Sequence, residues 1–222
     1  MDTTTIDYGS QQKKHPLSGA MFFIVLFAAW FVIGGVFLLL ENERSIYRMI
    51  NTHHTPVLDV ILSYVTYMGE SIVIIPLLIL LLLIPRFRTK KFILAFTVCN
   101  LTPFLVTQAI KAIVNAPRPL NYFQDADWIN RVAGQPANYN YSFPSGHSEG
   151  AFAFSCFLAL ILPKKYAAIG VIFFLLALAV GYSRIYLSQH FYVDVYTGSI
   201  VGTVCCLVAF AIINPFKDRN VV

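Results

Sequence analysis

The sequence predicts an all-α protein, a polytopic bundle of six helices that cross a membrane. Of its 222 residues, 57% are hydrophobic and only 12% are charged, whereas about 25% are charged in an ordinary soluble domain. Six apolar segments follow one another along the chain, and basic residues gather in alternate connections between them. Because the segments are continuous runs without polar alternation, they favour helices over the strands of a membrane barrel.

The predicted spans are bounded by charges, prolines or polar loops. A helical span needs about 20 apolar residues, so the shorter segments must extend into their flanks. A cleaved signal peptide at the first segment is the weaker alternative, because no small-x-small site ends the apolar run and one span would be lost. The six segments are residues 21–40, 71–84, 92–110, 150–162, 166–182 and 195–213.

The chain outside the spans divides into tails and two outer segments. Residues 1–20 and 214–222 are predicted cytoplasmic tails on either side of one membrane domain, residues 21–213. Between Glu41 and Met68, apolar residues recur at helical spacing, so we expect one or two interfacial helices on the outer face. The long outer loop, residues 115–147, is predicted to carry part of an active site, since long loops are often functional.

Basic residues indicate the orientation of the bundle. Four groups precede the first span, separate the second from the third, separate the fourth from the fifth, and follow the sixth. By parity all four face one side, which the positive-inside rule identifies as cytoplasmic. The net charge of +5 then reflects topology plus an anion site and does not argue for nucleic acid. The groups are Lys13 and Lys14; Arg86, Arg88, Lys90 and Lys91; Lys164 and Lys165; Lys217 and Arg219.

Three polar clusters lie at the opposite, outer ends of the spans, so parity predicts that they share one aqueous side. Together they supply three cations to offset a phosphate, two histidines to act as nucleophile and acid, and one carboxylate. This inventory suits phosphoryl transfer. The clusters are Lys111 with Arg118; Pro144, Ser145, Gly146 and His147; and Ser183 and Arg184 with His190 and Asp194.

In the first cluster, Lys111 and Arg118 lie two helical turns apart, but Pro117 and Pro119 are expected to break the helix between them. Arg118 then becomes a planar donor for bidentate phosphate contact just beyond the helix end. The alternative is that both cations only anchor the helix at the interface by snorkelling.

The second cluster immediately precedes an apolar helix, whose N-terminus offers free N–H groups to an anion. Gly146 allows close backbone approach, Ser145 offers a hydroxyl, and His147 can protonate a departing oxygen. The alternative is an ordinary N-cap with an unrelated histidine.

In the third cluster, His190 and Asp194 are one helical turn apart and are expected to face each other. The carboxylate can hold one imidazole N–H and leave the other nitrogen free to attack phosphorus. Arg184 can reach back to the bound phosphate. The fourth span is short, about 22 Å against a hydrocarbon core of about 30 Å. His147 at its head should therefore sit near or below the outer lipid surface, which suits a phosphate carried on a lipid.

In this order, the motifs Lys-x6-Arg-Pro, Pro-Ser-Gly-His and Ser-Arg-x5-His-x3-Asp resemble the three-part signature of the type-2 phosphatidic acid phosphatase superfamily, which also contains vanadium haloperoxidases. The match runs from Lys111 to Asp194 and no motif position departs from it. The resemblance implies that His190 is a nucleophile forming a phosphohistidine, that Asp194 orients it and that His147 is the general acid. It further implies that no metal or other cofactor is needed, and that the phosphate is held by Lys111, Arg118, Ser145, Gly146 and Arg184.

The sequence thus predicts an integral-membrane phosphatase that removes phosphate from a membrane lipid on the extracytoplasmic side of a bacterial inner membrane. Undecaprenyl diphosphate, phosphatidylglycerol phosphate and phosphatidic acid are the candidate substrates, and a lipid A phosphate is the alternative. A transporter or lipid-binding protein is an alternative of another class, but it would spread charges through the bilayer depth. Glu149 and Glu70 are possible headgroup contacts, although Glu149 equally suits a first-turn acid that complements the helix dipole.

Overall fold

A computed structural model describes residues 17–216, which fold as a helical bundle without strands in that range. The helices in chain order are α1 (Met21–Leu40), α2 (Glu43–Thr52), α3 (Pro56–Val65), η1 (Thr66–Gly69), α4 (Ser71–Leu82), η2 (Pro85–Phe87), α5 (Lys90–Val114), α6 (Pro119–Tyr122), α7 (Gly146–Ile161), η3 (Lys164–Tyr166), α8 (Ile169–Tyr186) and α9 (Tyr192–Ile213). A helix therefore occupies each of the six predicted apolar segments.

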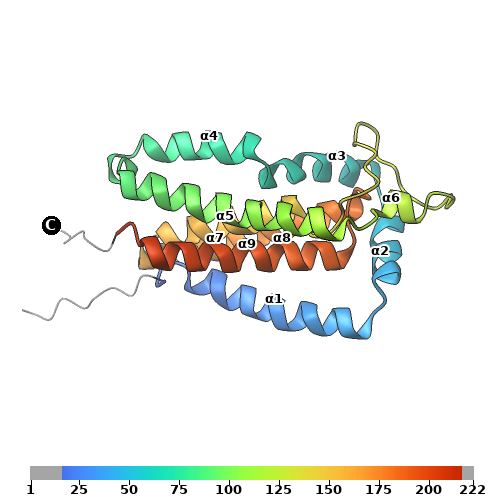
Figure 1. Cartoon of the computed structure of the whole chain (residues 1–222), viewed down its shortest axis with the longest axis horizontal. Helices are drawn as coiled ribbons and strands as arrows, with labels where there is room; N and C mark the ends of the chain where they lie inside the picture. The colour runs from blue at the N-terminus through green and yellow to red at the C-terminus, as the bar shows by residue number, and fades with distance from the viewer. Residues whose placement is uncertain (1–16, 217–222) are drawn as a thin grey trace, which may run out of the picture.

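The long helices run up and down along one axis, so the bundle has two distinct ends (Figure 1). The α4–α5 and α7–α8 connections lie at one end, together with both ends of the described chain. Helices α2 and α6 and the long loop before α7 lie at the other end. The structure thereby separates the basic connections at Arg86–Lys91 and Lys164–Lys165 from the three motif clusters, as parity predicts.

Among the described residues, four helices are long and apolar enough to cross a membrane: α1, α5 with its extension to Tyr122, α8 and α9. A fifth span arises if α3 with η1 is joined to α4, a pair that is bent by 58°. Helix α7 is apolar but has 16 residues. The structure therefore supports four or five spans, and the predicted sixth stays a prediction.

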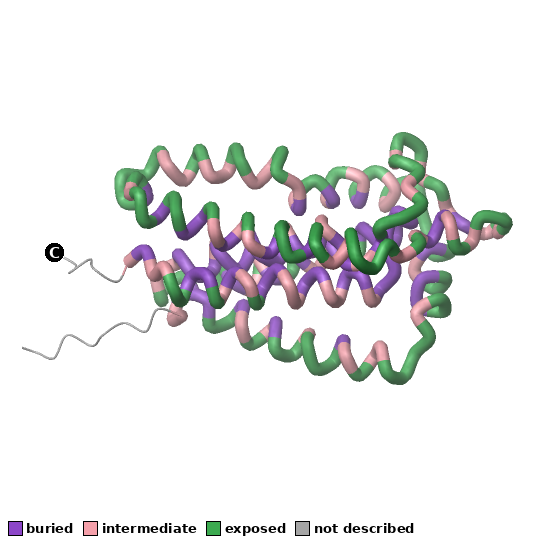
Figure 2. The backbone as a smooth tube through the Cα atoms, viewed as in Figure 1, coloured by how far each residue is buried: buried purple, intermediate pink, exposed green. Residues whose placement is uncertain are grey.

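Helix α7 is the centre of the bundle, and it packs against α5, α8 and α9. Figure 2 shows its path as nearly continuous burial, whereas α1 and α4 carry exposed residues along much of their lengths. Aromatic rings fill the interior, with Phe152 against Phe27 and Phe174, and Phe157 against Phe96 and Phe210. The exposed apolar side chains of α1 and α4 suit a lipid surrounding, whereas every residue of α7 is buried or partly buried.

The N-terminal turn of α7 is held between two closely approaching backbones. A side chain at Gly198 of α9 would place its Cβ 2.5 Å from the Ser145 carbonyl oxygen. At Gly69 of η1, a Cβ would collide with the carbonyl group of His147. The absence of side chains at these two positions fixes where the second motif sits relative to the third.

The expected helices between Glu41 and Met68 are present as α2 and α3, and their position at a membrane interface stays a prediction. Helix α2 crosses the motif end of the bundle (Figure 1) and buries Tyr47 among the rings of Phe123, Trp128 and Phe191. The Tyr47 hydroxyl donates to Ser188, so α2 braces the turn that leads to His190. Lys13, Lys14, Lys217, Arg219 and most of the two predicted tails lie outside the described residues.

Candidate active site

The first cluster sits where α5 ends, as the prolines predict. Asn115 terminates the helix in a left-handed conformation with φ of 43°, and Arg118 follows in extended backbone. The outer loop then returns beside this segment, since Arg118 N donates to Tyr139 O and Ser142 N donates to Ala116 O. This backbone pairing places the second cluster beside the first.

Both cations of the first cluster are fixed by the loop backbone. Lys111 Nζ donates to the Tyr141 carbonyl at 2.6 Å. Arg118 Nε donates to the Asn140 carbonyl at 2.9 Å, and its Nη1 donates to the side chain and carbonyl of Gln189. The two side chains are thus oriented by neutral acceptors, which leave their positive charges available to an anion.

Ser145 caps the N-terminus of α7. Its hydroxyl accepts from Ser148 N and from the Ser148 hydroxyl, and its own N–H donates to the carbonyl of Asp194 at 2.9 Å. The capping alternative is therefore correct for Ser145, and it is compatible with an anion site, because the helix N-terminus still directs N–H groups and positive dipole toward the cluster. Gly146 begins the helix and has open space where a Cβ would lie.

Arg184 is a buried cation with unused hydrogen-bonding capacity. It lies in the last turn of α8 and is 4% exposed. Its Nη1 donates to the Thr66 hydroxyl of η1 at 2.6 Å, whereas its Nε is buried without a hydrogen-bond partner among the described residues. A buried guanidinium with an unpaired donor is costly on its own and is well suited to an anionic ligand.

His190 and Asp194 face each other across the start of α9, as their spacing predicts. Their closest atoms, Nδ1 and Oδ2, are 3.5 Å apart, which is long for a direct hydrogen bond. Ser142 lies beside both: its hydroxyl donates to Asp194 Oδ2 at 2.5 Å and is 3.4 Å from His190 Nδ1. Asp194 also accepts from Phe191 N at 2.9 Å. This pattern assigns the proton to Nδ1 and leaves the Nε2 lone pair of His190 free.

Electrostatic interactions link His190 to the three cations of the first and third clusters. Burial and then the positive charges of Arg118, Arg184 and Lys111 lower the pKa of His190 well below 6.5. The histidine is therefore neutral at physiological pH, the state in which an imidazole is a nucleophile. His147 lies within electrostatic range of the same three cations and of His190. The predicted cluster residues are thus brought together at one end of the bundle.

The two acids singled out in the sequence have different environments. Glu70 lies between η1 and α4, and its Oε1 is 2.5 Å from Nε2 of His147. Glu149 is buried one turn into α7 and interacts electrostatically with Lys111. Among the described residues, no group of three or more His, Cys, Asp or Glu side chains is arranged to hold a metal ion.

Sequence reasoning missed three residues that position the site: Ser142, Thr66 and Gln189. Ser142 stands two residues before the Pro-Ser-Gly-His motif, a proximity that could have indicated it. Nothing in the sequence pairs Thr66 with Arg184, since they are 118 positions apart. Gln189 is the neighbour of His190, and its buried amide ties Arg118 to the outer loop through Pro136 and Asn138.

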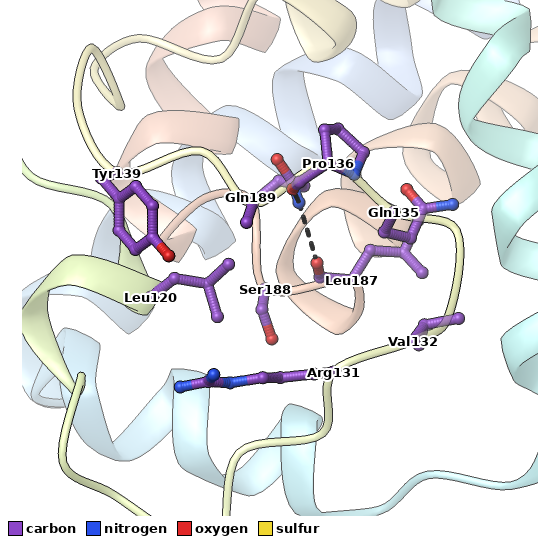
Figure 3. A pocket seen from close by; sticks show the side chains of 10 residues that line it. Leu120, Arg131, Val132, Gln135, Pro136, Tyr139, Leu187, Ser188 and Gln189 are labelled. Carbon is purple, nitrogen blue, oxygen red and sulfur yellow. Dashed lines mark hydrogen bonds between the residues drawn. The ribbon is translucent and has the colours of Figure 1, made fainter.

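A cavity of about 80 Å³ lies between the outer loop and the turn after α8 (Figure 3). Gln189, Ser188 and Leu187 line one side of it, and Pro136 and Arg131 belong to the loop side. Figure 3 shows the Gln189 amide directed at the Leu187 carbonyl, to which it donates at 3.3 Å. The cavity thus lies beside a chain segment that hydrogen bonds from Gln189 and Ser188 hold to the loop.

Comparison with known proteins identifies a family and several relatives. The model of the PAP2 superfamily matches residues 90–218, more than half of the chain. An undecaprenyl-diphosphatase of Sulfolobus acidocaldarius is 24% identical over 188 residues, which cover 82% of this chain and 86% of that protein. Phosphatidylglycerophosphatase B of Bacillus subtilis is 27% identical over 215 residues, or 92% of this chain and 95% of that protein.

A solved structure is also similar. The crystal structure of Aquifex aeolicus LpxE matches with a TM-score of 0.64 and 30% sequence identity, covering 75% of this chain and 93% of that chain. Residues 90–218, which the superfamily model matches, include every residue of the three clusters.

Proposed function

Because the chain belongs to the PAP2 superfamily, we propose that it hydrolyses a phosphomonoester or diphosphate on a membrane lipid through a phosphohistidine at His190. Its relatives are phosphatases named for lipid phosphates, and the chain is a lipid phosphatase of an integral-membrane type. The observation that carries the mechanism is the environment of His190, whose neutral, buried imidazole lies within electrostatic range of Lys111, Arg118 and Arg184.

The reaction begins when the phosphate is bound by Lys111, Arg118 and Arg184 with the N–H groups at the start of α7. The unpaired Nε of Arg184 supplies one donor of this site. His190 Nε2 attacks phosphorus, while Ser142 and Asp194 hold Nδ1 and disperse the positive charge that develops on the ring. His147 protonates the departing oxygen, and water then cleaves the phosphohistidine.

The membrane arrangement completes the proposal. Helices occupy all six predicted apolar segments, and we assign α7, too short to qualify alone, as the sixth span of one domain, residues 21–213. The basic connections would face the cytoplasm by the positive-inside rule. The site would then open on the extracytoplasmic face, with the cytoplasmic tails on the other side, and the host membrane would be a bacterial inner membrane.

Undecaprenyl diphosphate and phosphatidylglycerol phosphate are the substrates of choice, because relatives named for these two activities cover most of the chain. Phosphatidic acid shares the terminal phosphomonoester, and a lipid A phosphate is the alternative. The clustering of cations at one end of the bundle, opposite the basic connections, disfavours the transporter alternative.

The experiment uses purified protein in detergent micelles with EDTA and measures phosphate release from these four lipids. We expect turnover of at least one lipid in EDTA, and its loss in His190→Ala with unchanged yield and helix content. An exposed histidine, His54, supplies the matched control, since His54→Ala should retain wild-type turnover. Acid-labile, base-stable labelling of the protein with 32P-lipid should also require His190, because phosphohistidine is hydrolysed by acid but survives alkali.

Two results would contradict the proposal. Turnover retained in His190→Ala would remove this residue as the nucleophile. Activity that disappears in EDTA and returns with a divalent cation would replace it with a metal-dependent mechanism.

A further inference from the structure

The contact between Glu70 and His147 joins two elements that are far apart in the sequence. Glu70 follows η1 at the bend before α4, and His147 lies in the first turn of α7. Their nearest atoms, Oε1 and Nε2, are 2.5 Å apart, and the side chains are 37% and 26% exposed respectively. The pair therefore sits at the accessible edge of a site whose other histidine is only 1% exposed.

The bend at Glu70 is fixed by packing, so the contact is not a chance encounter of mobile side chains. Gly69 lies against the His147 carbonyl, and Gly150 of α7 lies against the Gly69 carbonyl. Neither position has room for a side chain. The backbone of η1 is thus seated directly on the first turn of α7, and this seating presents the Glu70 carboxylate to the imidazole.

The charges around His147 make this carboxylate necessary for a protonated ring. Lys111 of α5, Arg118 after it and Arg184 of α8 all repel a proton on His147, and His190 lies nearby in the connection to α9. On α9 the acidic group is Asp194, which is bound to Ser142 and Phe191 N beside His190. Glu149, the other acid of α7, interacts with Lys111. Glu70 is the acid in direct contact with His147.

We propose that Glu70 is a positioning residue that stabilises the imidazolium form of His147 and so makes it the general acid; this inference rests on the function proposed above. The site then contains two histidines of opposite character. Asp194 and Ser142 fix the tautomer of the neutral nucleophile, whereas Glu70 neutralises the charge of the acid. An imidazolium has two N–H groups, so one can bind Glu70 while the other meets the leaving oxygen.

The proton balance of the reaction follows from this assignment. As His190 Nε2 forms its bond to phosphorus, the bond from phosphorus to the leaving oxygen breaks and that oxygen takes the proton of His147. Water then attacks phosphorus, the nitrogen–phosphorus bond breaks and its electron pair returns to Nε2. The proton lost by water passes to His147, which restores the imidazolium beside Glu70.

The test compares pH profiles of kcat/KM for the wild type and Glu70→Gln, with the preferred lipid phosphate in EDTA. Glutamine keeps the size of the side chain but not its charge. We expect the basic limb of the profile to move to lower pH by about 1–2 units, with about a tenfold loss of activity per unit on that limb. Glu41→Gln, an exposed acid after α1, is the matched control and should leave the profile unchanged.

Two further measurements distinguish this role of Glu70 from a purely structural one. The loss in Glu70→Gln should be smaller with p-nitrophenyl phosphate, whose leaving group needs little protonation. In a protein that already carries His147→Gln, adding Glu70→Gln should lower kcat/KM by less than about a further twofold. The effects of two residues that act through one another are not additive. Glu70→Asp, which retains the charge, should keep the basic limb closer to that of the wild type than Glu70→Gln does. Glu70→Ala, which also removes the charge, serves as the deciding variant if Glu70→Gln is poorly folded.

An unchanged basic limb in Glu70→Gln, or in Glu70→Ala where that variant decides, would overturn the inference. Equal losses for both leaving groups, or a full additional loss in the His147→Gln background, would do the same. These outcomes are separate from failure of the proposed function, because they can occur while His190→Ala remains inactive. Turnover in His190→Ala would instead remove the mechanism on which the inference rests.

Discussion

Replacing Arg184 by lysine separates the charge of this side chain from its geometry. Arg184 is buried, with Nη1 bound to Thr66 and Nε unpaired among the described residues. Lysine keeps the charge but has no planar fork, so it cannot bind Thr66 and phosphate with separately directed donors. One charge-assisted hydrogen bond to the transition state is then lost. Such a bond contributes about 1.5–3 kcal/mol, which corresponds to a decrease in kcat/KM of about 10- to 150-fold.

The assay is phosphate release from mixed micelles at substrate concentrations well below KM, so that kcat/KM is measured directly. Arg44→Lys is the matched control. Arg44 is an exposed arginine of α2 that lies over the ring of Tyr122, 4.4 Å from its centroid, and it does not contact the motif clusters. The same exchange at this position should change kcat/KM by less than about twofold, since exposed charges contribute little.

A wild-type kcat/KM in Arg184→Lys would refute the reasoning, because it would mean that the guanidinium geometry is not used in the transition state. A decrease of equal size in Arg44→Lys would refute it differently, by showing that the exchange acts through general charge or stability. Vanadate adds a binding readout, since it mimics pentacoordinate phosphorus. Its inhibition constant should rise in Arg184→Lys by a factor similar to the loss of kcat/KM.

Two further predictions concern Ser142 and His190. Ser142→Ala removes the hydroxyl between Asp194 Oδ2 and His190 Nδ1, and it should lower kcat about tenfold, the effect of one hydrogen bond. Ser45→Ala, at an exposed position of α2, is the control. An unchanged kcat in Ser142→Ala would exclude a bridging role for this hydroxyl. The pKa of His190 lies well below 6.5, so acidification should remove the neutral nucleophile only below that pH, and kcat/KM should stay level from pH 7 to 6.5; an acidic limb centred above pH 6.5 would contradict this.

Much of the bundle follows from local features of the sequence. Apolar runs predict helices at all six segments, because each run can satisfy its backbone only internally in lipid. Prolines and a capping serine predict where α5 ends and α7 begins. In the described part of the chain, four or five helical spans are long and apolar enough to cross a membrane, and the sixth stays a prediction. Helix α7 is shorter than a membrane is thick, and its central position comes from contacts with α5, α8 and α9 that a single segment does not encode.

The sequence by itself determined which residues we propose for the chemistry, because phosphate binding and histidine catalysis need particular side chains at fixed local spacings such as that of His190 and Asp194. It did not determine their partners. The tertiary structure placed Ser142 between that pair, Thr66 against Arg184 and Glu70 on His147. Each of these contacts joins segments that are distant in the chain. Their positions depend on how closely the helices pack. At Gly69 and Gly198, two backbones approach each other directly because neither glycine has a side chain.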